Sequence, residues 1–257
     1  MQTGLSAASL FVISGAAIAA GLVNAIAGGG SLISFPVLTA VGLPAVTANL
    51  TNTVALLPGY GGAALAQRRD LAGQRGRALL LLPPAALGGF LGAVLLLRSG
   101  EAIFDMLVPW LILLGTGLLA LQEPLRGWLL AKQNPLNRHG LESAATLPVF
   151  LVSIYGGYFG AGLSVILLAV LAVLLNDSLT RLNGLKQGLA LQVNLAAALL
   201  FVASGRLDWS ATIVMALGSS LGGLLGGRLA SRVSPAQLRA VVVLLGLAVG
   251  LTFLLRP

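Results

Sequence analysis

Two glycine-rich breaks interrupt apolar stretches of the sequence, and each is followed by a serine. The first reads Asn24-Ala-Ile-Ala-Gly-Gly-Gly-Ser31, and the second reads Tyr155-Gly-Gly-Tyr-Phe-Gly-Ala-Gly-Leu-Ser164. A glycine inside a helix costs roughly 1 kcal/mol relative to alanine, so we expect the backbone to open at both places. Ser31 is a natural N-cap for the helix that follows the first break. The candidate binding residues in the two breaks are Asn24, Gly28, Gly29, Gly30, Ser31, Tyr155, Tyr158, Gly160, Gly162 and Ser164.

The chemistry expected of such breaks is anion binding. A helix that begins beyond a break directs free N–H groups and the positive end of its dipole toward the break. A tight turn or close glycine packing would explain the first break equally well, but the similar second break favours a binding site. A nucleotide-binding P-loop is much less favoured, because no Gly-Lys-Ser/Thr follows the glycines.

Polar residues also gather in two other apolar stretches. The candidates there are Asn49, Thr51 and Asn52 in residues 46–67, and Asn183, Lys186, Gln187 and Asn194 in residues 179–203. Polar groups at membrane depth often hydrogen-bond between helices, and we expect this of about half of them. Lys186 is either an anchor that extends to the membrane surface or a fixed positive charge that faces a transport path. We favour the second interpretation.

The remaining reactive residue types argue against catalysis. All seven Asp and Glu residues fall in loops or at segment ends, His139 stands alone, and the chain has no cysteine. This pattern leaves no carboxylate relay, thiolate site or His-based metal site. We therefore expect no enzyme, no metal and no cofactor.

The elements that carry these residues are membrane helices. Of the 257 residues, 57% are hydrophobic and only 9% are charged, whereas soluble domains contain about 25% charged residues. The sequence predicts an all-α, polytopic integral membrane protein forming a single membrane domain over residues 1–257. Ten apolar segments are expected, at residues 5–26, 31–42, 46–67, 76–97, 104–122, 144–159, 163–175, 179–203, 209–227 and 237–255. The second and seventh are too short to span a bilayer and are expected to be broken or re-entrant half-helices.

The segments divide into two similar halves. Leu87-Gly-Gly-Phe-Leu-Gly92 recurs as Leu221-Gly-Gly-Leu-Leu-Gly226, a shift of 134 residues. We interpret the chain as two inverted five-segment repeats, about residues 5–123 and 143–256, joined by a cytoplasmic linker at about 124–142. Gly88, Gly92 and their counterparts are expected to be positions of close helix packing.

The basic residues predict the orientation. If each short segment and the segment before it together cross the membrane an even number of times, twelve Lys and Arg residues lie on one side of the membrane and three on the other. The crowded side is expected to be cytoplasmic, which places both termini outside. The basic residues are spread over loops and form no clustered face, so nucleic acid is not an expected partner.

Together these motifs resemble the TauE/SafE sulfite exporter family. The likeness rests on Ala27-Gly-Gly-Gly-Ser31 with Pro36, the Thr51-Asn52 pair, residues 156–162, Lys186, Asn194, Phe201, Gly205 and Asp208-Trp209. The resemblance implies transport of small anions such as sulfite, organosulfonates or related carboxylated compounds. The chain departs from it at Thr53, where many relatives have Lys, and at Leu163, where Gly is common.

We therefore expect a secondary transporter in the cell membrane that carries a small anion by alternating access around a site at mid-membrane depth. The alternative function is that of a membrane accessory or assembly subunit with no transport of its own.

Overall fold

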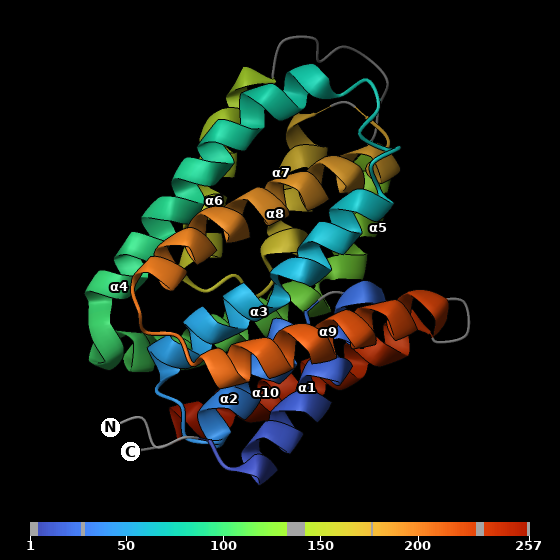
Figure 1. The fold of residues 1–257 in the computed structure, drawn as a ribbon. Helices are drawn as coiled ribbons and strands as arrows, with labels where there is room; N and C mark the ends of the chain where they lie inside the picture. The colour runs from blue at the N-terminus through green and yellow to red at the C-terminus, as the bar shows by residue number, and fades with distance from the viewer. Residues whose placement is uncertain (1–4, 27–28, 133–141, 176, 230–233, 256–257) are drawn as a thin grey trace.

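The computed structural model describes residues 5–26, 29–132, 142–175, 177–229 and 234–255, and over these residues the fold is helical with no strand (Figure 1). The helices are α1 (Ala7–Ile26), α2 (Ser31–Ala40), α3 (Ala45–Ala66), α4 (Arg75–Ala120), α5 (Gln122–Lys132), α6 (Thr146–Tyr158), α7 (Leu163–Leu174), α8 (Leu179–Ala203), α9 (Trp209–Leu229) and α10 (Pro235–Leu254). A short 3₁₀ turn, Ser143–Ala145, precedes α6.

The helix boundaries agree with the sequence-based expectation to within a few residues. The expected segments 76–97 and 104–122 are joined in α4, which bends sharply at Gly100, where φ is 72° and ψ is 177°. Only glycine adopts such a conformation readily, so α4 consists in effect of two helices separated by this kink. Helix α5 was not expected, and it occupies part of the stretch interpreted as a linker.

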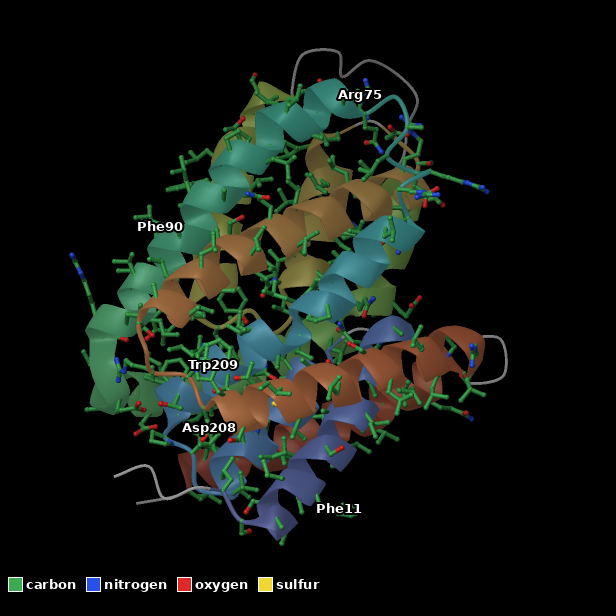
Figure 2. All side chains as sticks on the ribbon, in the orientation of Figure 1. Phe11, Arg75, Phe90, Asp208 and Trp209 are labelled. Atoms are coloured by element: carbon green, nitrogen blue, oxygen red, sulfur yellow. The ribbon has the colours of Figure 1, made fainter. Side chains whose placement is uncertain are left out.

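Within the described ranges, five helices are long and apolar enough to cross a membrane: α1, α4, α8, α9 and α10. Helices α2 and α7 have only 10 and 12 residues. At 1.5 Å per residue they reach about 15–18 Å, roughly half of the hydrocarbon thickness. Large apolar side chains such as Phe11, Phe90 and Trp209 are exposed on the periphery (Figure 2), as expected for a surface solvated by lipid. The chain is a polytopic membrane protein.

The helices form two groups that meet along α3 and α8 (Figure 1). One group contains the first part of α4 with α6, α7 and α8, and its core includes Leu81, Val149, Leu167 and Leu189. The core of the other group is built mainly from α1, α2, α3, α9 and the second part of α4. Because each group has its own buried apolar core, the space between the groups is where a polar site can lie.

Glycines allow two pairs of helices to approach closely. A Cβ atom added to Gly222 of α9 would lie 2.0 Å from the carbonyl oxygen of Ile18 in α1. A Cβ atom added to Gly92 of α4 would lie 2.1 Å from the carbonyl oxygen of Ile154 in α6. Neither distance is compatible with a side chain, so the expectation of close packing at these glycines is confirmed.

An ion-pair cluster lies within the first of the two helix groups, on the basic side of the molecule. Arg77 contacts Glu142 at 2.7 Å and Asp177 at 2.6 Å, and Arg181 contacts Asp177 at 2.9 Å. Burial alone would raise the pKa of the Asp177 carboxyl, but hydrogen bonds from Arg181, the Ser178 N–H and Arg77 hold that pKa below its ordinary value. Asp177 therefore remains ionised and keeps the α7–α8 connection attached to the start of α4.

Candidate anion-binding cavity

A cavity of about 370 Å³ lies between the two helix groups. It is lined by the end of α1, the starts of α2, α7 and α8, the last turns of α3 and α4, and the start of α5. Nine of the residues expected from the sequence to bind substrate line it: Asn24, Gly29, Ser31, Gly160, Gly162, Ser164, Asn183, Lys186 and Gln187.

Both half-helices begin at the cavity. Gly29 and Gly162, with φ of 85° and 78°, turn the chain immediately before α2 and α7. The Ser164 N–H has no backbone acceptor among the described residues. The expected openings in the backbone are thus present. The N-termini of α2 and α7, which are the positive ends of the helix dipoles, both lie at the cavity.

One detail of the first break differs from the expectation. Ser31 is the first residue of α2 and not its N-cap, since Gly30 holds the cap position and no side chain caps the helix. A Cβ atom on Gly30 would lie 2.3 Å from the Ala20 carbonyl oxygen of α1. Only glycine fits where the chain passes so close to α1, and the helix therefore begins without a side-chain cap. The Ser31 side chain is left to line the cavity.

Lys186 supplies the charge of the site. Its side chain comes from the second turn of α8, is 9% exposed and lines the cavity. Within the described part of the chain, no carboxylate lies within 4.0 Å of its ammonium group, and no Asp or Glu lines the cavity. A buried cation without a counter-ion carries a desolvation penalty of several kcal/mol, which a bound anion would reduce.

Amide and hydroxyl groups surround this cation. Asn183 Nδ2 donates to Gln67 Oε1 at 2.6 Å, which joins α8 to α3 across the cavity. The half-buried phenol of Tyr60 is within hydrogen-bonding reach of the Ser31 side chain. Gln122 Oε1 is buried without a partner among the described residues, so the cavity also offers an acceptor to a ligand that carries a donor.

The polar residues expected at the start of α3 lie outside the cavity and bond within the protein. Asn49 Nδ2 donates to the Tyr158 carbonyl oxygen at 2.9 Å, and the Ser34 hydroxyl donates to Asn52 Oδ1 at 2.5 Å. Thr51 Oγ1 accepts a 3.3 Å hydrogen bond from the backbone N–H of Asp208. In this conformation these side chains connect helices.

The other candidates outside the cavity also have internal partners. The Tyr155 hydroxyl donates to the Ala161 carbonyl oxygen, and the Tyr158 hydroxyl lies 3.3 Å from that of Ser99. Asn194 Nδ2 donates to the Ala190 carbonyl oxygen of its own helix at 2.8 Å. Gly28 lies outside the described residues, and Gly30 contacts α1 as described above.

Sequence reasoning missed four polar residues that line the cavity: Tyr60, Gln67, Gln122 and Thr180. The spacing of the first two in the sequence could have revealed them. Tyr60 and Gln67 are seven residues apart on α3 with Ala63 between them, so they share one helix face. Gln122 and Thr180 lie at helix ends, where a polar residue is ordinary and gives no signal.

The lining offers hydrogen-bond donors and one positively charged side chain, which are groups suited to an anion. It contains hydroxyl, amide and ammonium groups without an adjacent acid–base pair. No group of three or more His, Cys, Asp or Glu residues that could hold a metal ion occurs in the described residues. The arrangement fits reversible binding of a small negative solute.

Comparison with known proteins agrees with this geometry. The family model "Sulfite exporter TauE/SafE" matches residues 13–253. The chain is 31% identical over 202 residues to a "Probable membrane transporter protein" of Haemophilus influenzae, covering 79% of this chain and 77% of that protein. It is 26% identical to "Probable membrane transporter protein ORF9" of a Sinorhizobium species, covering 97% and 93%.

A third relative is the "Probable membrane transporter protein YfcA" of Escherichia coli K12, 25% identical over 80% of this chain and 74% of that protein. No solved structure matches the chain significantly. The matched family model spans nearly all ten helices, including both half-helices and Lys186. The chain therefore belongs to the TauE/SafE sulfite exporter family.

Proposed function

We propose that this protein is a secondary transporter that carries a small anion, such as sulfite, an organosulfonate or a related carboxylated sulfur compound, across the cell membrane. The cavity is the substrate site in this proposal. Lys186 attracts the anion, and the N–H groups and hydroxyls at the starts of α2 and α7 hydrogen-bond its oxygens. Membership of the TauE/SafE family supports the transport of a small anion.

The observation that carries the proposal is the environment of Lys186. The ammonium group is almost fully buried, lines a cavity large enough for a solute, and has no carboxylate beside it within the described residues. A lysine that served only as a membrane anchor would extend its ammonium group to bulk water. An intramembrane cation beside an open cavity is better explained by an anionic ligand.

Two inverted repeats would place this site at their interface, and the packing supports such a repeat. Helix α1 packs on α9 through Gly222, and α6 packs on α4 through Gly88 and Gly92. These contacts are related by the 134-residue shift, so the first helix of each half packs on the fourth helix of the other half. Broken helices that meet at a repeat interface are typical of secondary transporters.

The cavity lies toward the basic side of the molecule. Gln67 immediately precedes Arg68 and Arg69, and Thr180 immediately precedes Arg181. If that side is cytoplasmic, with the two ends of the chain outside, the structure is the inward-facing state of an alternating-access cycle.

Transport by purified protein tests the proposal. We expect liposomes that contain the protein to move labelled sulfite, thiosulfate or a sulfonate down its gradient, and we expect Lys186→Ala to remove most of that flux while it inserts normally. Absence of flux for every anion tested, from monodisperse protein, would contradict transport and favour an accessory or assembly subunit. Wild-type flux in Lys186→Ala would refute the role given to Lys186.

A further inference from the structure

Four aromatic rings pack together near the kink of α4, and none of these four residues lines the cavity. The Phe35 ring lies edge-on to those of Phe104 and Phe159, with centroids 6.3 and 5.4 Å apart. Phe104 also contacts Tyr158 at 5.7 Å and Phe159 at 6.1 Å. Phe35, Phe104 and Phe159 are 6% exposed or less. These four residues, from α2, α4, the end of α6 and the break after it, are called the aromatic cluster below.

Three residues of the aromatic cluster occupy positions that the internal repeat assigns to a second cavity. The shift between the repeats is 133 residues around the breaks, where Ser31 corresponds to Ser164, and 134 residues in α3 and α8, where Asn49 corresponds to Asn183. At these shifts four residues that line the cavity correspond to aromatic residues, namely Ala25 to Tyr158, Ile26 to Phe159, Leu168 to Phe35, and Gln67 to Phe201. In each pair the member without an aromatic ring lines the open cavity. The three phenylalanines are buried in the core.

We propose that the aromatic cluster is the gate that closes the substrate path on the side opposite the cavity, and that its rings must separate before the site opens there. The proposal rests on the proposed transport function and adds the residues that control access from the second side. Edge-to-face ring pairs are each worth about 0.5–1.5 kcal/mol beyond their buried area, a strength that a conformational change can overcome.

A polar side chain at the kink of α4 holds the same region closed. Glu101 Oε2 accepts a 2.9 Å hydrogen bond from the backbone N–H of Val46 at the start of α3. Glu101 Oε1 lies 3.7 Å from Arg206 in the connection between α8 and α9. One carboxylate thus joins α3, α4 and the α8–α9 connection beside the rings.

The repeat also indicates what lies behind the gate. Asn49 and Asn52 of α3 are the counterparts, at the shift of 134, of Asn183 and Lys186, which line the cavity. Asn49 is bound to the backbone of Tyr158, a member of the aromatic cluster, and its Oδ1 has no partner among the described residues. Separation of the rings would therefore release a polar face on α3 equivalent to the one that α8 presents now.

Cysteine labelling tests the gate without requiring transport, because the natural chain has no cysteine. Ala63 lines the cavity, and its counterpart at the shift of 134, Ala197, is fully buried in the core that contains the aromatic cluster. In oriented vesicles we expect Ala63→Cys to react with a membrane-impermeant maleimide from one side and Ala197→Cys to react slowly from both. Adding Phe159→Ala, which removes one ring of the aromatic cluster, should speed labelling of Ala197→Cys by about tenfold, and only from the side opposite to Ala63→Cys.

Matched variants separate gating from a general loss of structure. Leu171→Ala truncates an equally buried side chain in the other core and should leave labelling of Ala197→Cys unchanged. Phe35→Ala, which removes a second ring of the aromatic cluster, should act like Phe159→Ala, and Phe159→Leu takes the place of Phe159→Ala if the alanine variant is not monodisperse. Unchanged labelling in the Phe35 and Phe159 variants, or faster labelling from the same side as Ala63→Cys, would overturn the gate. Neither result would decide the proposed transport function, which is tested separately by the flux of the wild-type and Lys186→Ala proteins.

Discussion

Replacing Lys186 with methionine should weaken anion binding strongly without weakening the fold. A unit charge pair about 4 Å apart interacts by about 4 kcal/mol at an effective dielectric constant of about 20. Because Lys186 is 9% exposed and faces a cavity rather than bulk water, we take about half of that value as a lower bound. At about 1.4 kcal/mol per tenfold change, the variant should bind its anion about 30- to 1,000-fold more weakly.

The same change should not lower the stability of the ligand-free protein. Lys186 has no counter-ion within the described residues, so its removal abolishes a desolvation penalty and breaks no ion pair. Methionine retains much of the apolar length of the lysine side chain. The expected signature is weaker binding together with an equal or higher melting temperature.

Isothermal titration and the ligand-induced rise in melting temperature both measure this effect, because a ligand stabilises the state that it binds. Arg75→Met is the control, since it removes the same charge from an exposed position on the basic side. Equal affinity in the Lys186→Met and wild-type proteins would refute the electrostatic argument, as would a comparable loss of affinity in Arg75→Met.

Three further predictions concern the fold. Gly222→Ala should lower the melting temperature clearly, because the added Cβ would overlap a carbonyl oxygen of α1. Gly223→Ala should not, because the space around its Cβ is open. Equal effects of the two variants would contradict the close packing of α9 on α1. Asp177→Asn should destabilise the protein at neutral pH. Because the pKa of Asp177 is lowered in the folded state, the difference in stability between variant and wild type should shrink as the pH falls below about 4. A difference in stability that does not change with pH would refute this linkage. Single cysteines at Ala72 and Ser210, in equivalent parts of the two halves, should react from opposite membrane sides if the repeats are inverted, and labelling from one side would exclude inversion.

Much of the fold could be predicted because membrane helices are encoded locally. Long apolar runs, with glycine or charge at their ends, located every described helix except α5 to within a few residues, with two of the expected segments forming the two parts of α4. The breaks before α2 and α7 were predictable because consecutive glycines disfavour helix. The kink at Gly100 falls in the break expected between residues 97 and 104, where Arg98, Gly100 and Glu101 interrupt the apolar runs.

The cavity could be predicted only in part, because the polar face of a membrane helix can either hydrogen-bond to neighbouring helices or line a cavity. Lys186 and Asn183 line the cavity, whereas Asn49 and Asn52, which look equivalent in sequence, are bonded between helices. In the proposed cycle the difference depends on which half of the path is open, a property of the conformation that no local pattern records. Gln67 was missed for a related reason, since a polar residue beside Arg68 looks like an ordinary helix end.

The position of a bound anion tests the central claim most directly. An experimental structure of the protein with selenite, a heavier analogue of sulfite, would locate the anion by the anomalous scattering of selenium. We expect a single strong peak in the cavity, within hydrogen-bonding distance of Lys186 Nζ and of N–H or hydroxyl groups at the starts of α2 and α7. A peak elsewhere between the helices, with Lys186 making no contact to it, would contradict the account.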